Sequence, residues 1–244
     1  MTSQAQVHGG LQLRRRGRQL WSNFANLLFP LRCGGCQAPG SLWCDACRAA
    51  TVPIPAPLCE KCGAPSKVDG LCASCRAQPL RIDRIRSVAL FQGPLRQAIH
   101  RFKYQRLAGL ADPFGDLLAD YWCEHHFTAD WLVPVPLHSA RERDRGYNQS
   151  ALLARRLSQQ VNVPVADYGL RRTRATAVQM ELHAAQRKIN VAHAFGDVDS
   201  RLRGARVVVI DDVCTTGATL DACGDALCKA GAVSVMGLTL ARTP

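Results

Sequence analysis

The residues most suited to chemistry form one continuous run near the end of the chain. It reads Val-Val-Val-Ile-Asp-Asp-Val-Cys-Thr-Thr-Gly-Ala-Thr over residues 207–219, so a buried strand is followed by two acids and a hydroxyl-rich loop. Carboxylates accept hydrogen bonds from sugar hydroxyls, and the start of a helix favours an anion because its dipole is positive there. Gly217 allows a turn that a side chain would resist. The run therefore predicts a sugar-phosphate site.

Other interpretations of this run explain less of it. A Walker A loop needs a lysine after its last glycine, and a dinucleotide fingerprint needs three spaced glycines, whereas only Gly217 is present. An ordinary strand, turn and helix with a threonine N-cap leaves the adjacent Asp211 and Asp212 unexplained. Two like charges this close cost energy unless a ligand, a cation or a hydrogen-bond donor compensates for them. We therefore favour ligand binding.

A second constellation lies near the start of the chain, where cysteines occur in four Cys-x-x-Cys pairs. The pairs are Cys33/Cys36, Cys44/Cys47, Cys59/Cys62 and Cys72/Cys75. Because Zn²⁺ takes four ligands in a tetrahedron, eight paired cysteines predict two closed, structural zinc sites. Consecutive pairs can share a metal, and interleaved pairing is an open alternative. Disulfides are a less favoured third interpretation, since we expect a reducing cytoplasm.

The remaining four cysteines lack paired spacing, and we expect them to be small buried hydrophobic residues. They are Cys123, Cys214, Cys223 and Cys228. Cys214 lies next to the start of a predicted helix, where the thiol pKa can fall. We nevertheless interpret it as a packing residue.

The elements that must position these residues alternate between strand and helix. Strands are expected at 85–91, 131–136, 163–166, 207–210 and 233–240, and helices at 94–104, 110–123, 150–161 and 218–229. Such alternation predicts a parallel α/β sheet, with ligands bound beyond the carboxyl ends of its strands. Residues 137–149 are predicted to form a basic loop that binds a second anion. Residues 171–195 are predicted to form a long polar lid, although residues 184–191 could instead be a helix.

Charge and length limit the classes of protein that fit. The chain has 244 residues, a net charge of +12 and a pI near 9.5, so anionic partners are expected. Residues 141–190 hold ten Arg or Lys against four Asp or Glu. No apolar run reaches the length of a membrane helix, and residues 1–29 are expected to form a basic, amphipathic segment rather than a signal peptide. A cytoplasmic protein is predicted.

Together these motifs resemble the ComF/GntX family, in which a double zinc ribbon precedes a type I phosphoribosyltransferase-like domain. The acid run is similar to the phosphoribosyl-pyrophosphate (PRPP) motif of such transferases. The resemblance extends from the ribbons to the chain end through Phe102-Lys103-Tyr104, Val133-Pro-Val-Pro-Leu, Arg145-Gly-Tyr-Asn-Gln, Thr176-x-x-Gln179, Arg187-x-x-Asn190 and the terminal run. It implies a parallel sheet flanked by helices, with divisions at 1–29, 30–78 and 80–244 and a core at 130–244.

The resemblance also implies roles for individual residues. Asp211 and Asp212 would be the catalytic acids that bind the ribose hydroxyls of PRPP, with Mg²⁺ bridging its pyrophosphate. The implied PRPP-binding residues are Asp211, Asp212, Val213, Cys214, Thr215, Thr216, Gly217, Ala218 and Thr219. The implied pyrophosphate loop comprises Pro136, Leu137, Arg143, Arg145 and Gly146.

Two functions follow from the resemblance, and the sequence leaves both open. One is Mg²⁺-dependent transfer of phosphoribose to a nitrogen nucleophile, in a protein concerned with natural competence and the DNA-uptake machinery. The other is a PRPP-binding accessory protein without turnover that handles single-stranded DNA. The acceptor is not identified, because Phe91, Phe102, Tyr104 and Trp122 fit core packing as well as they fit stacking on a base.

Overall fold

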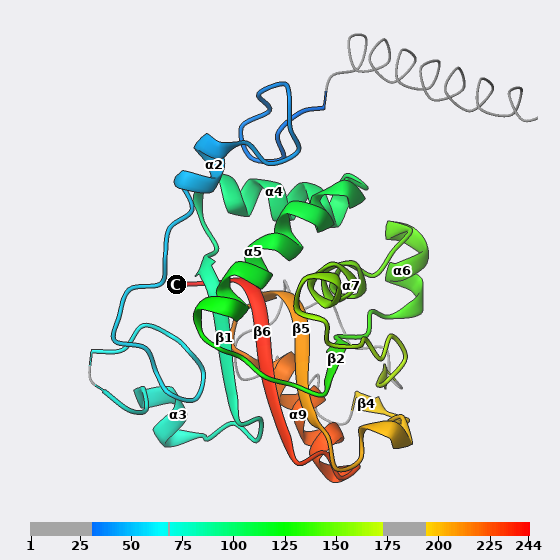
Figure 1. The fold of residues 1–244 in the computed structure, drawn as a ribbon. Coiled ribbons are helices and arrows are strands. Elements are labelled where there is room, and N and C mark those ends of the chain that lie inside the picture. Colours follow the sequence, from blue (N-terminus) through cyan, green and yellow to red (C-terminus); the bar gives the residue numbers. More distant parts are fainter. Residues whose placement is uncertain (1–30, 68, 173–193) are drawn as a thin grey trace, which may run out of the picture.

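A four-stranded parallel sheet forms the centre of the protein (Figure 1). The computed structural model describes residues 31–67, 69–172 and 194–244. The predicted segment 1–29 and the greater part of the predicted lid, including its alternative helix at 184–191, lie outside these ranges. The strands are β1 (Arg84–Leu90), β2 (Trp131–Pro134), β5 (Arg206–Cys214) and β6 (Ser234–Arg242), in the order β1-β6-β5-β2. Every pairing within this sheet is parallel, which confirms the predicted fold class.

Helices cover both faces of this sheet, which is why its central strands are apolar almost throughout. One face carries α4 (Gly93–Tyr104), α5 (Ala111–Glu124) and α7 (Gln149–Val161), and the other carries α9 (Ala218–Lys229) (Figure 1). Successive side chains of a strand alternate between faces. Accordingly Val208 and Ile210 of β5 belong to the core under α5 and α7, whereas Val207 and Val209 belong to the core that includes α9.

The predictions for one loop and one strand were wrong. Residues 139–145, expected within a loop, form the helix α6 (Ser139–Arg145). The His138 ring caps its start by accepting from the Ala140 amide, and Gly146 ends it with a left-handed φ of 86°. The expected strand at 163–166 is reduced to one parallel bridge between Leu132 and Val165. Pro164 lacks the N–H that a longer ladder would need.

The two cysteine ribbons are packed against the sheet domain at different places. The first includes the short helix α2 (Asp45–Ala49), and its Trp43 meets Phe114 of α5 edge to face, with ring centroids 5.7 Å apart. The second includes α3 (Ala73–Ala77) and lies against β1, where the Ile85 amide donates to the Lys61 carbonyl at 2.7 Å. Gly63 is required there, because a Cβ would lie 2.5 Å from the Ile85 oxygen.

The remaining elements are short. The strand β3 (Arg171–Arg172) pairs with β4 (Phe195–Gly196) in an antiparallel two-stranded sheet. Single 3₁₀ turns lie at Ala108–Leu110 and Ser200–Leu202. Across the described ranges, every helix is too short or too polar to cross a lipid bilayer.

Candidate functional site: an acid pair, a glycine turn and two cysteine clusters

Asp212 is a buried carboxylate held by a lysine from another element. It lies near the carboxyl end of β5 with 2% of the residue exposed, and its Oδ1 is 2.8 Å from Lys103 Nζ in the last turn of α4. Its Oδ2 is buried and has no hydrogen-bond partner among the residues that the structure describes. A buried carboxylate oxygen without a partner is costly. Asp212 therefore has an unused acceptor of the kind that a ligand hydroxyl satisfies.

Asp211 is half-buried and accepts two hydrogen bonds from the protein. Ser150 Oγ, at the start of α7, donates to Asp211 Oδ1 at 2.8 Å, and the Asp212 amide donates to the same oxygen at 2.9 Å. Burial raises the pKa of the Asp211 carboxyl to about 7, and the adjacent charge of Asp212 adds to the effect. Lys103 and Ser150 oppose it. Asp211 can therefore change its charge close to neutral pH.

The turn after the acids has the geometry that the sequence predicts. Gly217 adopts a left-handed φ of 79°, and a Cβ there would lie 2.9 Å from Ile85 Cδ1. The hydroxyl of Thr216 accepts from the Ala218 amide at 3.3 Å, and the first helical bond runs from the Asp221 amide to the Gly217 carbonyl at 2.8 Å. The N-terminus of α9 therefore opens directly at Thr215–Gly217, where its dipole favours an anion.

The other unpaired cysteines follow the prediction only in part. Cys214 and Cys223 are buried, and burial raises the pKa of the Cys214 thiol to about 11. Cys214 is therefore a packing residue, as predicted, despite its place before a helix. Cys123 and Cys228 are exposed, which contradicts the expectation that all four are buried.

The basic residues predicted for a second anion lie on α6 and at its end. Arg145 donates to Gln149 Oε1, and its guanidinium lies 5.6 Å from the centre of the Tyr104 ring. Gln149 precedes Ser150, so Arg145 is tied to the residue beside the Asp211 contact. Arg143 is exposed. Pro136 and Leu137 follow β2, where Asn148 Nδ2 fixes the chain by donating to the Val135 carbonyl at 3.0 Å.

Sequence reasoning assigned no role to Lys103 or Ser150. Lys103 occurs in the family motif, but its contact with Asp212 depends on how α4 lies over the sheet. One signal could have indicated it: Lys103 follows Ile99 by four residues, so the two share a helix face, and Ile99 is fully buried. A lysine on a core-facing stripe needs a buried partner.

Replacing Lys103 with Met is expected to destabilise the protein at pH 8. The change leaves the Asp212 charge buried without its cation, and breaking a buried ion pair costs about 3–5 kcal/mol. The loss should be smaller at pH 5.5, where Asp211, whose pKa is raised to about 7, is protonated and one buried negative charge rather than two lacks the lysine. Urea unfolding at both pH values measures it, with Lys103→Arg as the charge-retaining control. Equal stability of the Met variant and the parent at pH 8 would contradict the assigned pair.

Each cysteine cluster is suited to hold one zinc ion. The four sulfurs of Cys33, Cys36, Cys44 and Cys47 lie within 4.8 Å of one another, as do those of Cys59, Cys62, Cys72 and Cys75. The Sγ atoms of Cys36 and Cys44 lie 3.6 Å apart, and those of Cys62 and Cys72 lie 3.8 Å apart. A tetrahedron with Zn–S bonds of about 2.3 Å requires sulfurs about 3.8 Å apart. Consecutive pairing is therefore confirmed, and the interleaved alternative is wrong.

The protein environment also favours thiolate at one cysteine in each cluster. The Cys44 amide donates to Cys33 Sγ at 3.5 Å, and the Cys72 amide donates to Cys59 Sγ at 3.3 Å. Burial raises the pKa of both Cys33 and Cys59, but backbone N–H groups outweigh it and lower each pKa to about 6. All twelve cysteines are free of disulfides. Donation to sulfur stabilises the form that binds metal.

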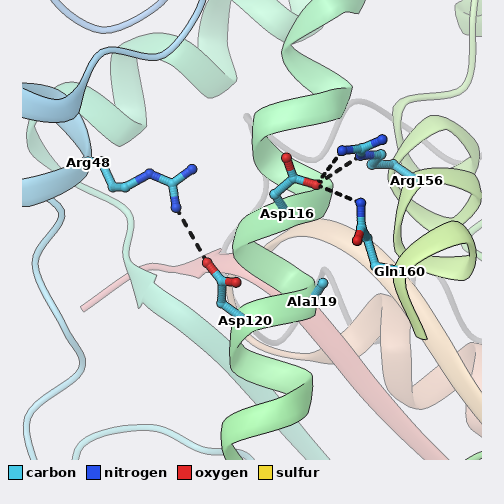
Figure 2. A pocket seen from close by; sticks show the side chains of 6 residues that line it. All are labelled: Arg48, Asp116, Ala119, Asp120, Arg156 and Gln160. Carbon is cyan, nitrogen blue, oxygen red and sulfur yellow. Dashed lines mark hydrogen bonds and ion pairs between the residues drawn. The ribbon is translucent and has the colours of Figure 1, made fainter.

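A surface pocket lies away from these groups, between the first ribbon, α5 and α7 (Figure 2). Its charged side chains pair with one another: Arg156 contacts Asp116 at 2.8 Å, and Arg48 contacts Asp120 at 3.4 Å. Gln160 also donates to Asp116. This pocket contains none of the predicted site residues and offers a ligand little charge that is not already compensated.

Two family models match separate parts of the chain. The double zinc ribbon domain matches residues 24–76, and the phosphoribosyl transferase domain matches residues 148–244. The first match includes both cysteine clusters. The second begins at the cap of α7 and includes the acid pair, the glycine turn and α9.

Curated relatives match the greater part of this chain. DNA utilization protein YhgH of Escherichia coli (strain K12) is 34% identical over 227 residues, which cover 89% of this chain and 99% of the relative. Competence protein ComFC of Bacillus subtilis (strain 168) is 29% identical over 84% of this chain and 86% of its own length. Competence protein F of Haemophilus influenzae is 31% identical over 76% of this chain and 85% of its own length.

Proposed function

The chain belongs to the ComF/GntX family, and on this premise we propose that its acid pair and glycine turn bind PRPP. The observation that carries the proposal is the buried Asp212 Oδ2, an acceptor without a partner among the described residues, in a strand that leads into a left-handed Gly217 at a helix start. A carboxylate that needs a donor and a helix N-terminus that favours an anion together match a phosphorylated sugar with free hydroxyls.

Each part of PRPP would meet a different element. Asp211 and Asp212 would accept from the ribose hydroxyls, and the loop Thr215–Thr219 would surround the 5′-phosphate. Arg143 and Arg145, with Gly146 and the chain after Pro136, would face the pyrophosphate. Mg²⁺, when bound with PRPP, would neutralise charge on the leaving pyrophosphate. Holding the ribose fixed while these cations face the leaving group is the protein's contribution to bond cleavage.

We further propose that the protein acts in DNA uptake or in the use of imported DNA. The support comes from relatives that are named for DNA utilization and for competence and that are matched over 85% to 99% of their length. A cytoplasmic location belongs to the same proposal. We also propose that the chain divides into a double zinc ribbon at 30–78 and a phosphoribosyltransferase-like domain at 80–244, with the core of that domain at 130–244.

The alternative is a PRPP-binding accessory protein without turnover. One observation favours it: both acids are already held by protein side chains, Asp212 by Lys103 and Asp211 by Ser150. Release of pyrophosphate from Mg²⁺–PRPP in the presence of free nucleobases and amines separates the two cases. Steady release with one acceptor supports the transferase. Binding of PRPP without release, together with salt-sensitive binding of single-stranded DNA, supports the accessory protein.

PRPP affinity is expected to rise with pH up to about 7 and then to level off. The pKa of Asp211 is raised to about 7 from 3.8, so the free protein holds a proton in this range that a hydroxyl-binding carboxylate must lose. Binding at pH 6 should therefore release a proton and be about tenfold weaker than the plateau, since one pKa unit is a factor of ten. Calorimetry in buffers of different ionisation enthalpy measures that proton.

The raised pKa of Asp211 also makes the stability of the folded protein depend on pH. Because the folded form binds the Asp211 proton more tightly than the unfolded form, this group's contribution to stability falls as pH rises from about 4 to about 7. For the proton release on PRPP binding, Asp211→Asn is the control. The phosphates of PRPP titrate in the same pH range, and their contribution to the proton release remains in this variant. A proton release that is equal in the parent and the variant would exclude Asp211 as its source.

A further inference from the structure

The last turn of α4 presents one side chain to the acid pair and its neighbour to solvent. Lys103 reaches Asp212 at 2.8 Å, while Tyr104 is 57% exposed. The His100 ring leans against Tyr104 with centroids 4.7 Å apart and an angle of 47° between the planes, so it is not stacked flat on the ring. An exposed aromatic ring therefore borders the residue that holds Asp212.

Arg145 connects the same ring to the other acid. Its guanidinium carbon lies 5.6 Å from the centre of the Tyr104 ring, and it donates to the buried Gln149. The next residue along α7, Ser150, donates to Asp211 at 2.8 Å. The pair of Tyr104 and Arg145 is thus tied to Asp212 through α4 and to Asp211 through α7.

The structure separates Tyr104 from the other aromatic residues that the sequence offered for stacking. Phe102 and Trp122 are 0% and 5% exposed, and Phe102 packs edge to face on Phe114 with centroids 5.8 Å apart. Phe91 is half-buried against the same core. Tyr104 alone of these four is largely exposed. It lies among cations: Arg145 contacts its ring, and Arg106 donates to the Asp144 carbonyl at 3.0 Å on the adjoining α6.

We propose that Tyr104 and Arg145 form a stacking surface for a nucleobase beside the acid pair. This inference rests on the proposed function, since the base would be placed next to a bound ribose. A flat base is recognised by an aromatic ring and a guanidinium plane, and such stacking tolerates any base. The same chemistry fits a free base, as the acceptor of the sugar, and an unpaired base of single-stranded DNA, whose phosphates the neighbouring arginines would attract.

Binding of two kinds of probe tests the surface. Adenine and uracil stand for free bases, and a fluorescent oligo-dT of 20 nucleotides stands for single-stranded DNA, each added to the zinc-loaded full chain with Mg²⁺–PRPP present. Tyr104→Ala should weaken at least one kind of probe about tenfold or more. Tyr104→Phe keeps the ring and should stay within about twofold. Tyr168→Ala removes another exposed tyrosine, 78% exposed, and should change nothing.

The probes distinguish a free base from a base of single-stranded DNA. They also distinguish failure of the stacking surface from failure of the proposed PRPP binding. Loss of adenine or uracil binding alone assigns an acceptor site, and loss of oligo-dT binding alone assigns a strand site; either supports the surface. No binding of any probe by the parent, or equal binding by the parent and Tyr104→Ala, overturns it. Binding of Mg²⁺–PRPP is measured separately in the parent and in Tyr104→Ala. Its absence from the parent would refute the proposed function, whatever the base probes show.

Discussion

Replacing both Asp211 and Asp212 with Asn is expected to abolish the thermal stabilisation that Mg²⁺–PRPP gives the protein. An amide keeps the shape of the carboxyl but loses its charge and one acceptor oxygen. Hydrogen bonds to charged groups contribute about 1.5–3 kcal/mol each, so losing two should weaken binding at least a hundredfold. A melting curve with and without Mg²⁺–PRPP measures the loss, because bound ligand raises the melting temperature by mass action.

The control for this pair is Asp225→Asn on α9. Asp225 is also ion-paired, with Arg81 and Lys229 at 2.7 Å each, but it lies on the outside of the helix rather than at the carboxyl end of β5. This variant should retain the full stabilisation. The double variant should also retain two zinc ions per chain, since no cysteine is touched. Undiminished stabilisation of the double variant would show that the acids do not hold PRPP.

Replacing Cys75 with Ser is expected to remove one zinc ion per chain and to destabilise the protein strongly. Cys75 is 3% exposed and shares a hydrophobic core with Leu80, Ile82 and Leu220, so its ribbon is part of the packing behind the glycine turn. Structural zinc contributes about 10–16 kcal/mol of apparent binding free energy in small ribbons, which collapse without it. Loss of even 4 kcal/mol lowers the melting temperature by about 10 °C for a chain of this size.

The matched change is Cys228→Ser, since Cys228 is an exposed thiol outside both clusters. It should keep two zinc ions and melt within about 1 °C of the parent, as surface substitutions usually do. Native mass spectrometry counts the metal directly. Two retained zinc ions in Cys75→Ser, with an unchanged melting curve, would contradict the assigned cluster.

Local sequence patterns predicted the structure correctly where the deciding residues lie within one short stretch of the chain. The helix predicted at 218–229 is α9 with the same ends, since Gly217 and Gly231 both adopt the left-handed backbone that bounds it. The ribbons followed from spacing alone, because a Cys-x-x-Cys pair can turn both sulfurs toward one metal. Their consecutive pairing needed the structure, as equal spacers fit either arrangement.

Patterns failed where the deciding contact is nonlocal or unusual. The helix α6 was expected to be loop because its residues are charged and end in glycine, and its cap is a histidine ring rather than Ser, Thr, Asp or Asn. The contact between Lys103 and Asp212 joins distant parts of the chain and exists only when the last turn of α4 reaches the carboxyl end of β5. Exposure of Tyr104, which distinguishes it from the buried Phe102, likewise depends on packing between helices.

The most direct test of the account is calorimetric titration of PRPP into the zinc-loaded protein at pH 8 with Mg²⁺ present. We predict saturable heat at one site per chain and no heat with the Asp211→Asn, Asp212→Asn variant. A flat titration of correctly folded parent protein that retains both zinc ions would contradict the claim that this acid pair and its glycine turn bind PRPP.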